Sequence, residues 1–243
     1  MNEQPKMGMN RTGVQMSPID TNQMLDASTM MPVTPGDESA IADLRSSYIV
    51  EADQVGSVPP PGTVKGVLST GVSMLTGNNP NLLLDKLGER LAFERTGTRL
   101  YEALITKVQS LERTGTMTVS VEKLMQIRDE EARHFALIAE AIRSLGGDPT
   151  AQTPCADLVG VESMGLMQAL TDPRTTVSQS LHAIMVAEMT DNNGWEMLIA
   201  LAQEQNHDQL VHSFNTALSH EREHLQQVQS WLEQAMLGAP IIH

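Results

Sequence analysis

One pattern of residues occurs twice in this chain: a lone glutamate, followed well downstream by a Glu-x-x-His motif. The two copies comprise Glu94, Glu131 and His134, and then Glu188, Glu221 and His224. The paired glutamates stand 37 and 33 residues apart, which fits a long helix, a short turn and a second, antiparallel helix. Two such hairpins make a four-helix bundle, and its centre would receive enough carboxylates and imidazoles to bind two divalent metal ions.

The repeat extends beyond these six residues. An offset of 94 aligns segments 94–105 and 188–199, which agree at five positions and set Tyr101 opposite Trp195. The two Glu-x-x-His motifs align with an offset of 90 instead. We infer an internal duplication in which the turns differ in length while the positions of the candidate ligands are kept.

The candidate ligands also lie on the hydrophobic stripe of each predicted helix. Apolar residues recur at steps of three and four in all four segments, for example at Leu87, Leu91 and Ile105 in the first. A buried carboxylate without a partner is very costly. Four of them in one core therefore indicate bound cations, because two divalent ions would balance their charge.

A third Glu-x-x-His match, Glu204 with His207, is predicted to be a solvent-exposed coincidence in the turn between the third and fourth helices. About half a match is expected by chance, so the motif alone is weak evidence. The other two matches stand out because they lie at mid-helix on the core stripe. The alternative for them is a bundle with buried ion pairs or partly exposed acids.

The chain is predicted to form one all-α domain, residues 80–237, between an amino-terminal extension, residues 1–79, and a short tail, residues 238–243. The extension is Met-rich, contains three consecutive prolines and has no sustained period, so we expect it to be mostly disordered. The helices of the domain are predicted at 80–113, 120–145, 175–203 and 208–236, with one short helix near 162–170 in the crossover between the second and third.

Composition narrows the classes of function. The net charge of −14 argues against nucleic-acid binding. The sequence has no apolar run long enough for a membrane span and no basic leader followed by an apolar stretch, so we expect a cytoplasmic protein. The single cysteine, Cys155, excludes an internal disulfide and a thiolate metal cage.

The order Glu, Glu-x-x-His, Glu, Glu-x-x-His on four helices resembles the ferritin-like superfamily of carboxylate-bridged di-metal proteins, in particular its bacterioferritin and rubrerythrin-like branches. The resemblance implies that Glu94 and Glu188 each bind one metal terminally, that Glu131 and Glu221 bridge the pair, and that each histidine binds one ion. The chain lacks the cysteine pairs of a rubredoxin-type domain and leaves little room for a ferritin-type fifth helix.

Oxygen and nitrogen ligands without sulfur favour two iron ions, with two manganese ions as the alternative. Three further residues are candidates for a supporting role. Tyr101 and Trp195 project from the core stripe and would supply an electron, gate the site or only pack. Asp191 would orient a histidine ligand, or would remain an unpaired polar residue.

The resemblance implies a non-haem di-iron oxidoreductase that reduces dioxygen or hydrogen peroxide. With ferrous iron as the electron source it would be a ferroxidase, and with a separate electron-donor protein a rubrerythrin-like peroxidase. Three alternatives stay open: a manganese catalase-like enzyme, a non-enzymatic iron-binding or storage module, and a non-catalytic scaffold that folds normally without metal. We expect a homo-oligomer, and a storage module would need a closed multi-subunit shell.

Overall fold

The computed structural model describes residues 13, 16–31, 36, 38–53, 55–60, 80–112 and 119–237. Every element in these residues is an α-helix. The chain divides into two compact units, of which the smaller, residues 3–54, contains the first two helices and the larger contains all the others. The predicted tail and the first twelve residues of the Met-rich extension lie outside the described residues.

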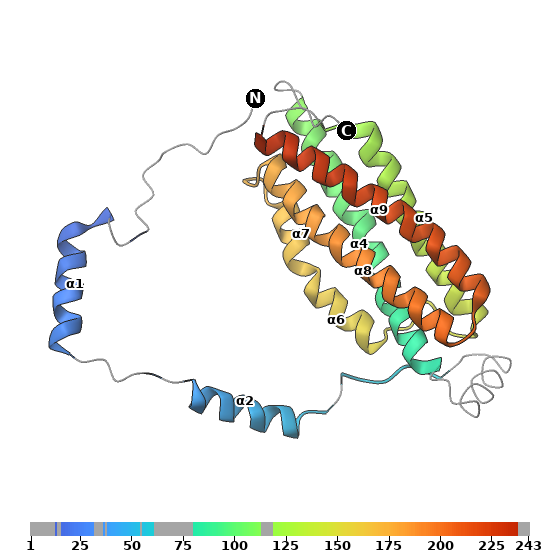
Figure 1. Ribbon diagram of the computed structural model, residues 1–243, viewed down its shortest axis with the longest axis horizontal. Coiled ribbons are helices and arrows are strands. Elements are labelled where there is room, and N and C mark those ends of the chain that lie inside the picture. Colours follow the sequence, from blue (N-terminus) through green and yellow to red (C-terminus); the bar gives the residue numbers. More distant parts are fainter. Residues whose placement is uncertain are drawn as a thin grey trace. The chain divides into compact units, whose positions relative to one another are not determined.

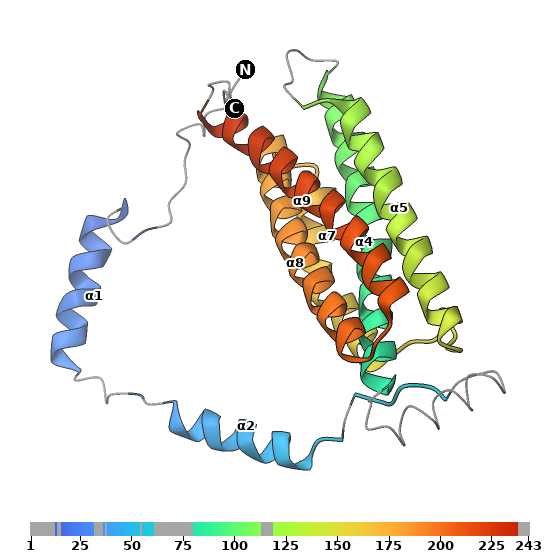
Figure 2. The same cartoon turned by 45° about the vertical axis from the view of Figure 1, so that its right-hand side comes forward.

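Four long helices form the bundle: α4 (Pro80–Glu112), α5 (Val121–Ser144), α8 (Val177–Glu204) and α9 (Asp208–Leu237). α4 packs against α5 and α8 packs against α9, so both predicted hairpins are present, and contacts between α4 and α8 join them. Figures 1 and 2 show the four helices running side by side. The predicted all-α bundle is confirmed.

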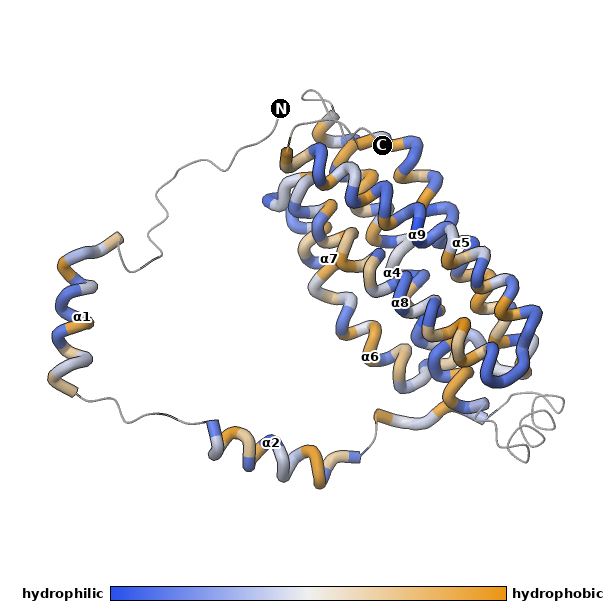
Figure 3. The backbone as a smooth tube through the Cα atoms, in the orientation of Figure 1, coloured by the Kyte–Doolittle hydropathy of each residue, from blue (hydrophilic) through white to orange (hydrophobic). Residues whose placement is uncertain are grey.

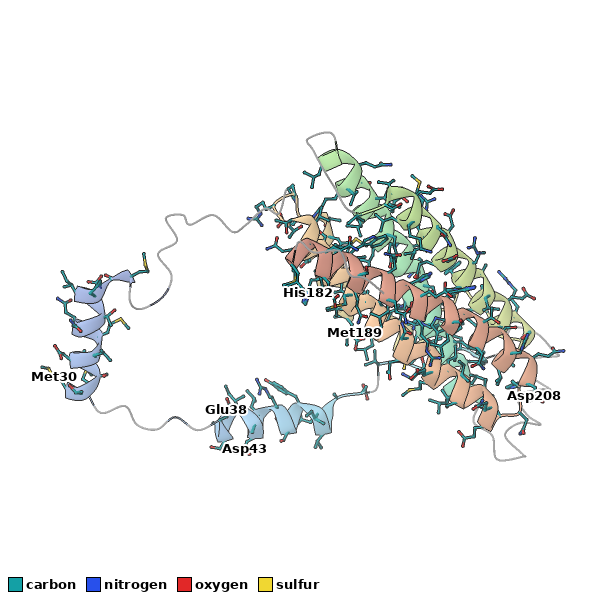
Figure 4. All side chains as sticks on the ribbon, turned by 45° about the horizontal axis from the view of Figure 1, so that its top comes forward. Met30, Glu38, Asp43, His182, Met189 and Asp208 are labelled. Atoms are coloured by element: carbon teal, nitrogen blue, oxygen red, sulfur yellow. The ribbon has the colours of Figure 1, made fainter. Side chains whose placement is uncertain are left out.

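Local sequence signals set the ends of these helices. The Ser120 hydroxyl caps α5 by accepting a hydrogen bond from the Lys123 amide at 3.2 Å. Thr176 and Gln179 form a capping box at the start of α8. The turn into α9 places Asn206 in the left-handed region, with φ of 60°, which asparagine tolerates better than most residues. The α8–α9 connection is therefore as short as the sequence predicted, and α9 begins at the residue labelled Asp208 in Figure 4.

The crossover from α5 to α8 contains two helices, α6 (Pro154–Glu162) and α7 (Met164–Thr171). The helix predicted near 162–170 corresponds to α7, but the prediction that the crossover holds a single helix was wrong, because it overlooked the start signal of α6. That signal is Thr153, whose hydroxyl caps the first turn just before a proline. Thr153 lies so close to α4 that a Cβ on Gly88 would overlap it. α6 therefore packs tightly along α4, and α7 contacts both α4 and α8.

The amino-terminal extension contains two helices that the sequence did not predict, α1 (Pro18–Met30) and α2 (Ser39–Glu51). Neither has a buried residue. Figure 3 shows hydrophobic and hydrophilic positions mixed around both helices, and side chains such as Met24 and Ile49 are exposed. These helices are held by local hydrogen bonds without a packed apolar stripe, which is why a search for hydrophobic periodicity does not find them.

The bundle core consists of two hydrophobic clusters with a layer of buried charged residues between them. On α8, for example, Leu181 and Ile184 belong to one cluster, and Leu198 and Ala202 belong to the other. The charged residues of this middle layer come from all four long helices: Arg90, Glu94, Glu131, His134, Glu188, Asp191, Glu221 and His224. Burial of so many ionisable groups is costly unless they neutralise one another or bind a ligand.

None of the described helices combines the length and the apolar character that a membrane crossing requires.

On the outer face of α8, the side chains of His182 and Met189 are exposed and are labelled in Figure 4.

Candidate metal centre

All six predicted ligands meet in the middle layer of the bundle. α4 provides Glu94, α5 provides Glu131 and His134, α8 provides Glu188, and α9 provides Glu221 and His224. Their exposed fractions run from 0% to 4%. Ligand atoms within 4.8 Å of one another form overlapping groups, one of Glu131, Glu188, Glu221 and His224, and another of Glu94, His134 and Glu221. The duplication therefore folds into two adjoining positions that share Glu221.

The carboxylate of Glu221 lies between the two imidazole rings. Its Oε1 contacts Nδ1 of His134, and its Oε2 is 3.1 Å from Nδ1 of His224. Glu131 approaches from the opposite hairpin, with its Oε1 3.4 Å from the same nitrogen of His224. Both histidines thus turn Nδ1 toward the carboxylates, which is the orientation that a histidine ligand in this cluster needs.

Several polar atoms of the cluster accept or donate no hydrogen bond among the described residues. They include both carboxylate oxygens of Glu94 and of Glu131, and Nδ1 of His134. Buried polar atoms in native proteins are normally satisfied, so a group of unsatisfied ones needs an explanation. Four carboxylates and two imidazoles fit a pair of hard or borderline divalent cations, which would satisfy these atoms directly.

Burial raises the pKa of Glu94, Glu188 and Glu221 well above the ordinary value for a glutamate, and the negative charges of neighbouring acids raise the pKa of each further. The charged form is thus disfavoured in the metal-free centre. A bound divalent cation reverses this preference, because it stabilises the carboxylate over the acid. The cluster is therefore suited to exchange protons for metal ions.

The two histidines respond to the centre in opposite directions. Burial, followed by the proximity of His224, lowers the pKa of His134 to about 3. Burial alone would also lower the pKa of His224, but the carboxylates of Glu131, Glu188 and Glu130 raise it to about 9. Because the ring centroids are 6.1 Å apart, a charge on one imidazole disfavours a charge on the other. The two pKa shifts therefore favour a protonated His224 beside a neutral His134 at neutral pH when no metal is bound.

A family model described as a ferritin-like domain matches residues 84–237. The chain belongs to the ferritin-like family. The match covers most of α4 and all of α5 to α9, so the resemblance predicted from the repeated motif is confirmed at the level of the superfamily. No curated protein matches this ferritin-like chain. The predicted similarity to the bacterioferritin and rubrerythrin-like branches stays a prediction.

Arg90 is a member of this ferritin-like centre that sequence analysis missed. It is buried and forms an ion pair with Asp191, and its Nη1 donates a hydrogen bond of 2.9 Å to the Asp191 carbonyl. Its Nε lies 3.4 Å from the carboxylate of Glu94, one turn along α4. The guanidinium also stands over the ring of Phe93, 4.3 Å from its centroid. Arg90 therefore links α4 to α8 beside one of the two candidate metal positions.

Asp191 was predicted to orient a histidine ligand or to remain unpaired. The structure instead pairs it with Arg90. Its carboxylate also lies within 4.8 Å of oxygen atoms of Glu94, Glu131 and Glu221. Burial raises the pKa of Asp191 to about 6, even though Arg90 acts in the opposite direction.

Tyr101 and Trp195 occupy equivalent places in the two halves but make different contacts. The hydroxyl of Tyr101 donates a hydrogen bond to Oε1 of Glu188. Trp195 is fully buried and presents its ring edge-on to His134, with centroids 5.6 Å apart, and it also packs on Phe214. Tyr101 therefore fixes a predicted ligand by a hydrogen bond, and Trp195 supports one by packing.

Two more residues that sequence analysis missed contact the outer nitrogens of the histidines. Nε2 of His224 lies 2.8 Å from Oε2 of Glu130, and Nε2 of His134 lies 3.3 Å from Nδ1 of His220. Glu130 and His220 are the residues immediately before the two Glu-x-x-His motifs. They are 90 residues apart, the same offset as the two motifs. This shared position in the repeat could have identified both residues from the sequence.

The third Glu-x-x-His match lies away from this centre. Glu204 is the exposed last residue of α8, and His207 lies in the following turn. The interpretation of this match as a coincidence is consistent with its place outside the buried layer.

Proposed function

We propose that this ferritin-like protein is a non-haem di-iron oxidoreductase that reduces dioxygen or hydrogen peroxide. The observation that carries the proposal is the buried cluster of four glutamates and two histidines, whose unsatisfied oxygen and nitrogen atoms lie within a few ångströms of one another. A ligand set of this kind matches iron held by carboxylates and imidazoles. In the proposed site Glu94 and Glu188 would each hold one ion, and Glu131 and Glu221 would hold both.

The chain's own residues would position these ligands. Arg90 holds the carboxylate of Glu94 from one side, and the Tyr101 hydroxyl holds that of Glu188 from another. The hydrophobic clusters above and below the layer exclude bulk water. A pair of iron ions bound there would supply two electrons to one oxidant molecule, with the protein providing geometry and a dry surrounding.

The proposed oxidoreductase could be either a ferroxidase or a peroxidase, and the two differ in the source of their electrons. A ferroxidase takes its electrons from ferrous iron delivered as substrate, whereas a rubrerythrin-like peroxidase takes them from a separate electron-donor protein. A manganese catalase-like enzyme needs no outside donor. A storage module would require a closed shell of many copies, which sedimentation of the full chain would reveal.

The first test is elemental analysis of the full chain produced with iron and manganese both available. Two iron ions per chain are expected, and two manganese ions would favour the catalase-like alternative. Glu131→Ala is expected to abolish occupancy by two ions, because it removes a bridge. Glu204→Ala is the matched control, since it alters the glutamate of the exposed Glu-x-x-His match and should leave two ions bound. Equal losses in both variants, or no bound metal in the unaltered chain, would overturn the proposal.

A second test addresses the reaction. The iron-loaded protein is mixed with dioxygen or with hydrogen peroxide under excess ferrous iron, and oxidant consumption is followed. Sustained consumption with ferrous iron alone indicates a ferroxidase. Consumption that stops after one turnover and resumes with an added reductant indicates a peroxidase that depends on a donor.

A further inference from the structure

The duplication gives the two metal positions the same ligand types, so a difference between them must come from the residues around them. The position at His134 uses Glu94 with Glu221, and the position at His224 uses Glu188 with Glu131 and Glu221. Oxygen atoms of both Glu131 and Glu221 also lie within 4.8 Å of Glu94, so each position has one terminal glutamate, one histidine and these two shared carboxylates. The contacts around the ligands, by contrast, differ between the two halves at the outer nitrogens of the histidines and at the terminal glutamates.

The outer nitrogen of His224 faces a carboxylate. Glu130 Oε2 accepts from His224 Nε2 at 2.8 Å, and the Glu130 side chain is only 14% exposed. A carboxylate that accepts the outer N–H of a histidine makes the inner nitrogen a stronger metal ligand and fixes the ring. Glu130 is itself held by Gln126, which donates to its Oε1 at 3.0 Å. The Glu130–His224 contact is therefore a preformed carboxylate–histidine pair.

The outer nitrogen of His134 faces an imidazole instead. His220 Nδ1 lies 3.3 Å from His134 Nε2, and the two rings are nearly parallel, at 14°. His220 stands in the same place of the repeat as Glu130 but carries no negative charge to strengthen its partner. The inner nitrogen of His134 consequently receives less support than that of His224.

A second asymmetry acts in the same direction at the terminal glutamates. Glu94 has the guanidinium of Arg90 at 3.4 Å, and this cation, although it is also paired with Asp191, competes with a metal ion for the Glu94 carboxylate. The equivalent residue in the other half is Ile184, which is uncharged. Glu188 instead receives a hydrogen bond from the neutral hydroxyl of Tyr101.

We propose that the two metal positions are unequal, and that Glu130 is the positioning residue that makes the His224 position bind its ion first and more tightly. The His134 position fills second and is the more readily exchanged. This inference rests on the proposed metal centre and adds an order of loading to it.

The test titrates the metal-free full chain with Co²⁺, whose ligands resemble those of Fe²⁺ and which is stable in air. Calorimetry gives the two stepwise affinities. Proton NMR detects the shifted ring N–H of each histidine that binds the paramagnetic ion, and His134→Ala and His224→Ala assign the two signals. The first equivalent is expected to shift the ring N–H of His224, and the second that of His134.

Glu130→Gln keeps the size of the side chain and an acceptor oxygen but removes the charge. It is expected to weaken the first step by about 10–100-fold, as is usual for an outer partner of a metal-binding histidine, and to leave the second step nearly unchanged. Adding His220→Glu to this variant is expected to reverse the order of filling. Glu140→Gln, an exposed charge change on the same helix, is the control and should alter neither step.

The proposal is overturned if the His134 signal appears first, if both signals grow together from the first addition, or if Glu130→Gln weakens both steps by the same factor. The last result would indicate a general structural role for Glu130. These outcomes leave the metal centre itself standing. If the unaltered chain binds no Co²⁺, both this inference and the proposed function fail.

Discussion

Gly194 on α8 lies directly against the guanidinium of Arg90 on α4, where a Cβ would overlap Nη1. The absence of a side chain at 194 gives Arg90 the space to reach Asp191 and Glu94. The equivalent residue of the first half is Leu100, so the repeat alone does not explain the glycine. Gly194 and Arg90 are therefore complementary, and they build the same side of the candidate metal centre.

Gly194→Ala is predicted to displace Arg90 and to destabilise the protein by about 1–3 kcal/mol, the usual cost of overpacking a well-filled core. Urea unfolding of the metal-free chain measures this change. Gly165→Ala in α7 is the control, because nothing lies within 4 Å of its added Cβ and alanine favours helix by about 1 kcal/mol. Equal effects at both positions would contradict the close approach of Arg90.

The metal-free protein is predicted to lose stability as the pH rises from 6.5 to 9. Burial raises the pKa of Glu94, Glu188 and Glu221, and nearby carboxylates, against the effect of burial, raise that of His224 to about 9. These groups bind protons more tightly when folded, so their stabilisation is lost as the pH passes their folded pKa values. Burial lowers the pKa of His134 from its ordinary value of 6.5 to about 3. This shift changes the stability only below pH 6.5, so it does not affect the predicted range.

Urea unfolding at pH 6.5 and pH 9 checks this dependence. Glu94→Gln removes one of the groups responsible and should reduce the loss of stability between the two pH values, whereas Glu140→Gln on the surface should leave it unchanged. A metal-free protein that is more stable at pH 9 than at pH 6.5 would contradict the prediction.

Removal of metal is predicted to lower the melting temperature. An ion present at one hundred times its dissociation constant adds about 2.7 kcal/mol of stability, which corresponds to roughly 5–10 °C for a domain of this size. Differential scanning calorimetry before and after dialysis against a chelator measures the shift, and Glu131→Ala should show little or none. An unaltered chain that melts at the same temperature without metal would favour the non-catalytic scaffold.

Tyr101→Phe is predicted to destabilise the metal-free protein by about 1–3 kcal/mol, because it leaves Oε1 of Glu188 buried without its donor. Two-metal occupancy should persist, since the hydroxyl is not a predicted ligand. Trp195 provides the comparison: its indole nitrogen has no hydrogen-bond partner among the described residues, so Trp195→Phe removes packing alone. Loss of both metals in Tyr101→Phe would show that the hydroxyl does more than hold Glu188.

The sequence predicted that the six candidate ligands would meet in the core, because each of them breaks a hydrophobic stripe at a repeated interval. It did not predict roles for Arg90, Glu130 or His220. A polar residue beside the hydrophobic stripe occupies the same position in the sequence whether its side chain points to solvent or into the core. Arg90 in particular depends on a space left by Gly194 on another helix, and such a relation has no linear signature.

The crossover shows a different reason for failure. Its first helix is specified by a capping threonine and a proline, signals that are common in loops as well. The exposed helices α1 and α2 have no apolar stripe at all. Periodicity therefore identified the four long helices of the bundle. It missed α6, which is too short to show a clear period, and α1 and α2, which have no buried face.

Each hairpin carries half of the candidate ligands, so neither half alone can complete the centre. The crossover through α6 and α7 ties the hairpins into one molecule, which keeps their effective concentration high whatever the dilution of the protein. Assembly of the centre is thus a folding event within one chain and does not depend on how many copies a cell contains. Two separate hairpins would have to meet in solution to complete the same cluster, so their association would weaken as the protein is diluted.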